Sequence, residues 1–245
     1  MRYLVNFTYD GSNYNGYQKQ HGLNTIQGKI ENALSSINNK KTNFSSSGRT
    51  DAHVHANNQY GHVDIDVNIT EYKLKCALNS LLPDDIYVKN VKVVNDNFHS
   101  RYDVIKKEYI YKINMGEYNP IERNYVYQLC KCLNVDKMKN ALKFIKGTHD
   151  FENFSSNEHK EKNTIRTIYS VNIKKNDNYL VLSIKGNGFL KYMVRIIVGI
   201  LIQIGLEKYD VNVINDIFDN KINFNYKKVA PAEGLYLNKV EYKKI

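Results

Sequence analysis

The sequence predicts an α+β protein built from two halves, each with the element order β-α-β-β-α-β. Segments in which apolar residues recur with a period of two, typical of strands, are interspersed with segments that have the spacing typical of helices. The same order of strand and helix segments occurs twice along the chain. The chain has 245 residues, of which 42% are hydrophobic, so it is long and apolar enough to bury a sizeable core.

In the first half, the patterns predict four strands and two helices. The strands are expected at 2–9, 42–47, 59–67 and 86–94. The first helix is expected to begin after Thr25, where apolar residues recur at helical spacing up to Ile37. Thr70 is suited to cap the second helix, and Pro83 is expected to end it.

The second half repeats this order with one short strand and one helix added. Strands are expected at 107–115, 125–129, 165–173, 179–186 and 234–242. Helices are expected from about Asn134, from Phe189, and near 211–219. The polar turn at 176–178 predicts that the two strands beside it form a hairpin.

Two such halves predict a ferredoxin-like (RRM-like) architecture, in which an antiparallel sheet packs on two helices. The polar stretch 95–103 separates the two patterns, so we expect an N-terminal half at 1–103 and a C-terminal half at 104–245. One face of each sheet should stay open, which suits RNA binding on a basic protein. The cleft between the halves is the expected place for an active site.

The charge of the chain indicates a polyanionic partner. There are 35 Lys and Arg against 25 Asp and Glu, giving a formal net charge of +10 and a pI near 9.2. Nucleic acid is the commonest polyanion that a basic protein meets. A base-composition bias toward lysine codons is the alternative explanation.

The location of the protein is expected to be the cytoplasm. The first ten residues lack the apolar core of a signal peptide. The longest apolar run, 189–206, contains Lys191 and Arg195 and is predicted to be a buried helix rather than a membrane span. The three cysteines do not form a disulfide framework, and Cys130 and Cys132 lack a second pair for a zinc site.

The stretch SSSGRTDAHVHA (45–56) concentrates groups that could carry chemistry. On an extended strand Asp51, His53 and His55 would share a face, as in a metal-dependent hydrolase. However, Gly-x-x-Asp favours a turn, which would separate them. A Ser/His/Asp hydrolase would need a G-x-S-x-G motif, and the sequence has none. The remaining possibility is that Asp51 is a nucleophile or base kept charged by Arg49.

This stretch resembles the GRTDAGVHA signature of the tRNA pseudouridine synthase A (TruA) family. Other sequence blocks of the family, before and after this stretch, are also matched in chain order. They are FTYDGSNYNGYQKQ (7–20), TIQGKIENAL (25–34), FHSRY (98–102), KEYIYKI (107–113), KGTHDFENF (146–154), TIRTI (164–168), NGFLKYMVRIIVG (187–199) and APAEGLYL (230–237). Two positions depart from the family pattern. His53 stands where the signature has Gly, and Tyr17 stands where the opening block has Trp.

The resemblance implies the pseudouridine synthase fold and the isomerisation of uridine to pseudouridine in the anticodon stem-loop of tRNA, at positions 38, 39 and 40. The base is expected to be flipped out of the RNA helix. Asp51 would be the essential carboxylate, acting as nucleophile or base. Among the substrate-binding residues, Arg49 would fill the place of the flipped base, Tyr109 would stack on it, and Arg195 would pair with the catalytic Asp. The reaction needs neither a cofactor nor a metal.

The resemblance also implies a homodimer in which one tRNA reaches across both subunits, with no membrane partner. The basic residues expected to contact RNA phosphates are Arg101, Lys106, Lys107 and Arg166. Two alternatives remain open from the sequence: a basic RNA-binding module without catalysis, and a paralogue that acts on a different RNA site.

Overall fold

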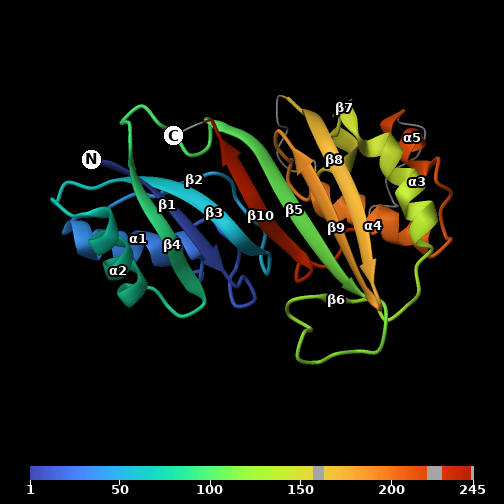
Figure 1. Ribbon diagram of the computed structural model, residues 1–245, viewed down its shortest axis with the longest axis horizontal. Helices are drawn as coiled ribbons and strands as arrows, with labels where there is room; N and C mark the ends of the chain where they lie inside the picture. The colour runs from blue at the N-terminus through green and yellow to red at the C-terminus, as the bar shows by residue number, and fades with distance from the viewer. Residues whose placement is uncertain (157–162, 220–227, 244–245) are drawn as a thin grey trace. The chain divides into compact units, whose positions relative to one another are not determined.

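The computed structural model describes residues 1–156, 163–219 and 228–243 of a mixed α/β protein (Figure 1). By its internal contacts the chain divides into two compact units. The first unit comprises Met1–Ile105 together with Tyr236–Ile245, and the second comprises Lys106–Leu235. The last strand therefore groups with the first unit, although its place in the sequence put it in the range 104–245.

The first unit is organised around three long antiparallel strands in the order β4-β1-β3. Two further strands lie beside β3: the short β2 is antiparallel to it, and β10 is parallel to it through Tyr236 and Leu237. The strands are β1 (Arg2–Tyr9), β2 (Ser45–Ser46), β3 (His55–Asp64), β4 (Ile86–Val94) and β10 (Leu235–Tyr242).

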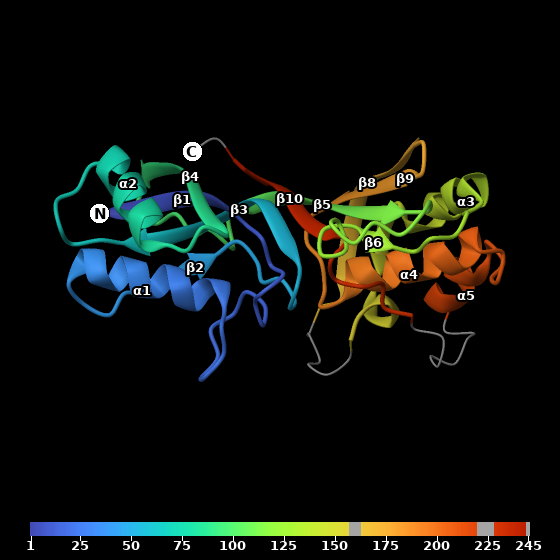
Figure 2. The same ribbon diagram turned by 90° about the horizontal axis from the view of Figure 1, so that it is seen from below.

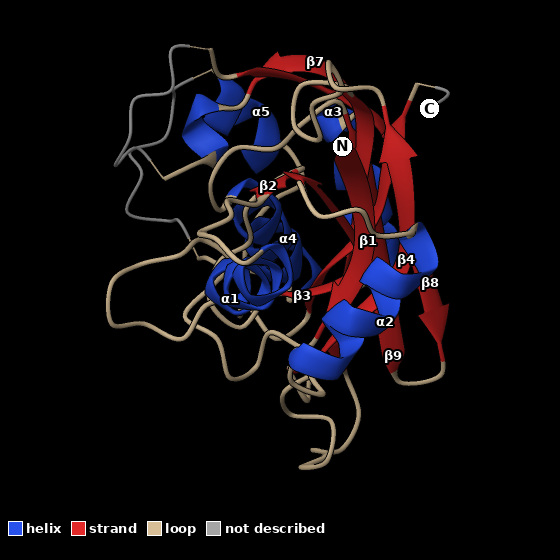
Figure 3. Cartoon of the chain, turned by 90° about the vertical axis from the view of Figure 1, so that its left-hand side faces the viewer, coloured by secondary structure: helices blue, strands red, loops and turns tan. Residues whose placement is uncertain are grey.

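The two helices of the first unit begin at the predicted caps. Thr25 caps α1 (Ile26–Asn38), and Thr70 caps α2 (Glu71–Leu81); each threonine side chain accepts a hydrogen bond from a backbone N–H of the first turn. Figure 3 shows α1 on one side of the strands of this unit. On β1 the fully buried rings of Tyr3 and Phe7 alternate with residues of the other face, as the period of two predicts.

The second unit contains an antiparallel sheet in the order β5-β9-β8-β7, with β6 parallel to β5. Its strands are β5 (Val104–Asn114), β6 (Tyr127–Gln128), β7 (Gly147–Asp150), β8 (Ile165–Asn176) and β9 (Tyr179–Gly186). Its helices are α3 (Val135–Ile145), α4 (Met193–Gly205) and α5 (Val213–Phe218), with a 3₁₀ turn, η1, at Glu152–Phe154. Figure 2 shows α4 on one side of the strands of this unit.

Helix α4 is the buried helix that the long apolar run predicts. All of its residues except Arg195 are buried. The helix begins at Met193 rather than at Phe189, because Tyr192 has a φ of +62° and a left-handed residue cannot continue a right-handed helix. No helix in the described parts of the chain is long and apolar enough to cross a membrane.

Several strands differ in their bounds from the sequence-based expectation: β6 contains only two residues of the predicted 125–129, β5 begins at 104 rather than 107, and β8 extends to 176 rather than 173. Strand β2 contains only two residues of the predicted 42–47, and β3 begins at His55 rather than at 59. Strand β7 was not predicted, because its four residues Gly-Thr-His-Asp contain no apolar alternation. It forms by pairing with β8, a contact made from Ile165 to Ile168 that local patterns do not reveal.

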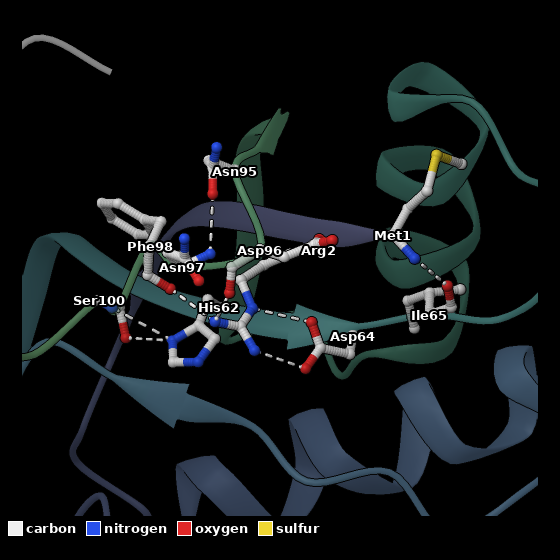
Figure 4. Close-up of polar contacts among 10 residues, drawn as sticks. All are labelled: Met1, Arg2, His62, Asp64, Ile65, Asn95, Asp96, Asn97, Phe98 and Ser100. Carbon is white, nitrogen blue, oxygen red and sulfur yellow. Dashed lines mark hydrogen bonds and ion pairs between the residues drawn. The ribbon is translucent and has the colours of Figure 1, made fainter.

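The segment 95–103, which leads out of the first unit, is fastened to the end of its sheet (Figure 4). The Arg2 guanidinium binds both carboxylate oxygens of Asp64 at 2.8 Å, and its Nη1 donates to the carbonyl oxygens of Asp96 and Phe98. The backbone N–H of Ser100 donates to His62 Nδ1 at 3.2 Å. His62 Nδ1 also lies 2.9 Å from Ser100 Oγ, so Ser100 holds this ring nitrogen through both its backbone and its side chain.

The buried position of His62 makes the stability of the first unit sensitive to acid. Burial, then the charges of Arg2 and His99, lower the pKa of His62 from 6.5 to about 4. Since the pKa is lower in the folded protein than in the unfolded chain, this stabilisation is complete above pH 6.5 and is lost as the pH falls toward 4. The expected loss from this one group is about 3 kcal/mol at pH 4.

Urea denaturation at pH 7 and pH 4.5 measures this loss in the wild type and in His62→Gln, which cannot take up a proton. The wild type should lose more unfolding free energy than the variant across this interval. An identical pH dependence in the two proteins would show that His62 does not carry the effect.

Candidate active site

The loop that carries Asp51 (residues 47–54, here the Asp51 loop) joins β2 to β3 and is held where it leaves β2. Ser47 N donates to Tyr60 O at 2.7 Å, and the Ser47 hydroxyl donates to Gln59 Oε1 at 2.5 Å. Gln59 Nε2 in turn donates to Gly48 O at 3.0 Å. Within the loop the Arg49 side chain is exposed and Asp51 is half-buried. A buried amide therefore fixes the start of a loop whose charged residues reach the surface.

Asp51 is the first residue of a tight turn. The turn is closed by the N–H of Val54, which donates to Asp51 O at 3.3 Å. Of its two central residues only His53 has a positive φ, +65°, which is the pattern of a type II turn. Glycine is the usual residue at that position, because other side chains are strained there. The turn explains why the family signature has glycine where this chain has His53.

The same turn removes the basis for a metal site at Asp51, His53 and His55. His53 is exposed, whereas His55 is buried at the start of β3 with its ring stacked on Tyr236 at 4.6 Å. His55 Nδ1 lies 3.1 Å from the Asp10 carboxylate and 3.1 Å from Gly11 N. Within the described ranges, no three His, Cys, Asp or Glu side chains are grouped so that they could hold a metal ion.

The opening segment (residues 9–17) supports the Asp51 loop from the other side. The hydroxyl oxygens of Tyr9 and Thr50 are 2.8 Å apart, and Tyr17 N donates to Thr50 O at 3.0 Å. Burial raises the pKa of Tyr9 to about 12, so its hydroxyl is a neutral hydrogen-bonding group at physiological pH. Two blocks of sequence that lie about 40 residues apart thus form one framework around Asp51.

Two glycines of the opening segment make this close approach possible. A Cβ atom on Gly11 would lie 2.1 Å from the carbonyl oxygen of Val54, far inside van der Waals contact. Gly16 has a φ of +94°, and a Cβ there would lie 3.2 Å from both Thr50 O and Ala52 N. The backbone of the opening segment therefore contacts the backbone of the turn directly, with no room for a side chain.

In the second unit, Tyr109 and Phe189 form an aromatic pair on the face of the sheet covered by α4. Their rings meet edge to face with centroids 5.1 Å apart. Tyr109 is buried, while Phe189 is half-buried just before α4 begins. Tyr111, two residues further along β5, is buried and donates its hydroxyl to Pro231 O at 2.8 Å. Tyr111 is thus a structural residue, and Tyr109 is the one whose ring contacts the half-buried Phe189.

Arg195 projects from the first turn of α4 and is held by two neighbours in the second unit. Its Nε donates to Ala230 O at 2.8 Å, and its guanidinium carbon lies 5.0 Å from the centre of the Tyr192 ring. The backbone of Ala230 also donates to Arg195 O at 3.0 Å. The planar guanidinium is therefore fixed in orientation, which is the property required for two-pronged binding of a carboxylate.

The predicted phosphate contacts do not all lie together. Lys107 pairs with Gly186 and shares the sheet face of Tyr109, and Arg166 lies on the same face of β8. Lys106 points to the opposite face, where its Nζ lies 5.2 Å from the centre of the Tyr169 ring. Arg101, in the first unit, is exposed beside the His62 end of β3, the end away from the Asp51 loop.

Sequence analysis missed three residues that shape these sites. Asp10 and Gly11 lie in a block that was matched to the family without any individual role, and their contact with the Asp51 loop is long-range. Phe189 has the spacing of a core residue, but its half-exposed ring against Tyr109 distinguishes it from the core. The sequence carried no signal that separates Phe189 from the core, because the predicted helix began at Phe189 itself.

Comparisons with known proteins agree on a single family. The family model described as tRNA pseudouridine synthase matches residues 6–103 and 141–243. A Bacillus cereus protein named tRNA pseudouridine synthase A 2 is 41% identical over 242 residues, covering 98% of this chain and 99% of its own. Proteins named tRNA pseudouridine synthase A are 38% identical in Limosilactobacillus reuteri (98% and 96% covered) and 40% identical in Thermoanaerobacter sp. (98% and 98% covered).

A solved structure of an unknown protein from Galdieria sulphuraria overlaps 76% of this chain and 79% of its own at 13% identity. Its TM-score of 0.22 is too low to support an argument about the fold.

The mixed α/β fold and the matched blocks around an aspartate-bearing loop define an RNA-modifying isomerase. The chain belongs to the tRNA pseudouridine synthase A (TruA) family, whose activity is the conversion of uridine to pseudouridine in tRNA.

Substitution of Gly11 tests whether the opening segment positions the Asp51 loop. Gly11→Ala should lower turnover at least tenfold, because the added methyl group must displace the carbonyl of Val54 and with it the turn that begins at Asp51. Gly22→Ala is the control, since a Cβ added to Gly22 has no atom within 4 Å and the φ of +74° makes alanine there strained by itself. Equal turnover in the two variants, measured as tritium released from tRNA labelled at uridine C5, would contradict the prediction.

Proposed function

We propose that the chain converts uridines of the anticodon stem-loop to pseudouridine, with Asp51 as the essential carboxylate. The observation that supports this most strongly is the position of Asp51: it is half-buried at the first residue of a turn held by backbone contacts to two separate segments. These contacts fix the backbone from which the Asp51 side chain projects, and a preorganised position of this kind favours a catalytic role. The target positions 38, 39 and 40 follow from the family resemblance.

The reaction is an isomerisation, so atoms and electrons balance without a co-reactant. The bond from ribose C1′ to uracil N1 breaks, the base turns within its pocket, and a bond from C1′ to C5 forms. The proton on C5 is lost and N1 gains one. Asp51 acts at the sugar, as nucleophile on C1′ or as a base. The target base must leave the RNA stack for the carboxylate to reach the sugar.

We assign the remaining roles from the local geometry of each unit and the family pattern. Arg49, exposed two residues before Asp51, takes the place of the flipped base. Tyr109 stacks on the target uracil, supported by the edge-to-face contact of its ring with Phe189. Arg195, whose guanidinium is fixed by Ala230 and Tyr192, pairs with the carboxylate of Asp51.

We infer a ferredoxin-like organisation for both halves of the molecule. In the range 1–103, the strand order β4-β1-β3 with β2 beside β3 is the order that a β-α-β-β-α-β module adopts. In the range 104–245, the antiparallel sheet with helices α3 and α4 supports the same assignment, with β10 contributed to the first unit.

We further propose that the enzyme is a cytoplasmic homodimer. The location follows from a tRNA substrate and the dimer from the family resemblance. Size-exclusion chromatography with light scattering should give about twice the chain mass of 28.5 kDa. A monomer that is fully active on tRNA would contradict the dimer.

The proposed role of Asp51 is tested by chemical mapping of pseudouridine in unmodified tRNA transcripts. The wild type should form pseudouridine in the anticodon arm, and Asp51→Asn should form none while still binding the tRNA. Asp66→Asn, a surface aspartate of the same unit, is the control and should act as the wild type.

The alternatives from the sequence are outcomes of the same experiment. Pseudouridine only outside the anticodon arm would indicate a paralogue with another site, and binding without any product would indicate an RNA-binding module. Loss of activity in EDTA would indicate a metal-dependent mechanism.

The electrostatic contribution of single cations to tRNA binding is a separate prediction. Arg166→Ala should reduce the slope of log Kd against log salt concentration by about 1, because one phosphate contact releases about one counterion. Lys174→Ala, an exposed lysine at the far end of the same strand, should leave the slope unchanged. Filter binding from 50 to 300 mM salt gives both slopes, and equal slopes in the two variants would remove Arg166 from the phosphate contacts.

A further inference from the structure

His53 is the residue of the Asp51 loop whose chemistry the proposed mechanism does not use. It occupies the turn position that favours glycine and adopts a φ of +65°. A non-glycine residue in this conformation is strained, and such strain persists where the surrounding structure holds it and where it serves the site. The question is therefore what an imidazole adds beside Asp51 that glycine cannot.

The orientation of the imidazole ring is fixed by the opening segment. His53 Nδ1 lies 2.7 Å from the carbonyl oxygen of Ser12, and the backbone N–H of His53 donates to Tyr14 O at 3.4 Å. A carbonyl oxygen can only accept, so Nδ1 carries the hydrogen. In the neutral side chain Nε2 is then an acceptor, and it lies on the side of the ring away from Ser12.

The proposed function brings RNA to the Asp51 loop and so to this exposed acceptor. His53 is exposed, and its two charged neighbours in the loop are the exposed Arg49 and the half-buried Asp51. RNA phosphates are acceptors only and cannot bond to a neutral Nε2. The groups of RNA that can donate are the ribose 2′-hydroxyl and the N–H groups of the bases.

We propose that His53 is a further substrate-binding residue, whose Nε2 accepts a hydrogen bond from a 2′-hydroxyl or base N–H of a nucleotide flanking the target uridine. This inference rests on the proposed role of the Asp51 loop. The Ser12 carbonyl fixes the ring in the conformation that presents Nε2, so little rotamer entropy is lost when RNA binds. The hydrogen bond with substrate thus offsets the free-energy cost of the strained turn.

Binding measurements in an inactive background test the contact apart from catalysis. The Kd for an unmodified tRNA transcript is compared between Asp51→Asn and Asp51→Asn/His53→Gly. Loss of one hydrogen bond should raise Kd about threefold to tenfold. His21→Gly, which removes another exposed histidine of the same unit, should change Kd less than twofold. A Kd within twofold of the reference for His53→Gly would overturn the proposal.

A second variant separates contact with RNA from tethering of the loop. His53→Asn keeps a residue that tolerates positive φ and a side-chain N–H that can reach Ser12 O, but it lacks Nε2. If the contact is with RNA, Asn should bind as weakly as Gly. Recovery of the reference Kd by Asn would mean that His53 acts only through Ser12, which would also overturn the proposal.

Substrate analogues identify the donor on the RNA. Single 2′-deoxy substitutions at the nucleotides flanking the target should weaken binding to the protein with His53 and not to His53→Gly if the donor is a 2′-hydroxyl. If none of these substitutions distinguishes the two proteins while His53→Gly still weakens binding, the donor is a base N–H. Turnover by Asp51→Asn would instead contradict the proposed function and leave the binding result intact.

Discussion

The contact between the opening segment and the Asp51 loop is the constraint on which the site depends. Backbone hydrogen bonds and the ring of His53 on Ser12 O join the two segments, and Gly11 and Gly16 allow the segments to touch where side chains would keep them apart. The hydroxyls of Tyr9 and Thr50 add one polar link within the core. Because these bonds join residues about 40 positions apart, the turn that begins at Asp51 has its shape only in the folded unit. A short polar loop is thereby made rigid without a large core of its own.

In the second unit, the segment that precedes β10 holds the neighbouring elements in place. Residues 230–234 bond to Arg195 through Ala230, to Tyr111 through Pro231, and to Lys112 through Gly234. The carbonyl of Ala230 fixes the guanidinium on α4, and the other two bonds fix β5, the strand of Tyr109. In both units, therefore, a residue to which we assign a role is supported by a segment far away in sequence, and rigid supports of this kind limit the reorganisation that a reaction needs.

Much of the fold could be predicted from local patterns. Strands β1 and β4 have the predicted bounds, and α1 and α2 begin at the threonines that local chemistry identified, because both periodicity and capping are decided within a few residues. Strand β7 could not be predicted, since its Gly-Thr-His-Asp sequence has no strand pattern and its pairing partner is distant.

The candidate site shows the same limit. The Gly-x-x-Asp sequence at 48–51 predicted a turn, and the turn observed begins at its last residue, Asp51. His53 could be marked as unusual from the family pattern alone. Its hydrogen bond to Ser12, the pairing of His55 with Asp10, and the position of Phe189 against Tyr109 depend on tertiary contacts that no window of sequence contains. Candidate catalytic and substrate-binding residues could be proposed from sequence, whereas the groups that orient them could not.

The central claim is that this framework presents the carboxylate of Asp51 to a uridine of tRNA. The most direct measurement is a single-turnover experiment with the enzyme in excess over one unmodified tRNA transcript, in which pseudouridine at each position is followed with time. The account predicts complete conversion in the anticodon arm by the wild type, and no conversion by Asp51→Asn at concentrations where the tRNA is fully bound. Conversion by Asp51→Asn at a rate close to that of the wild type would contradict it.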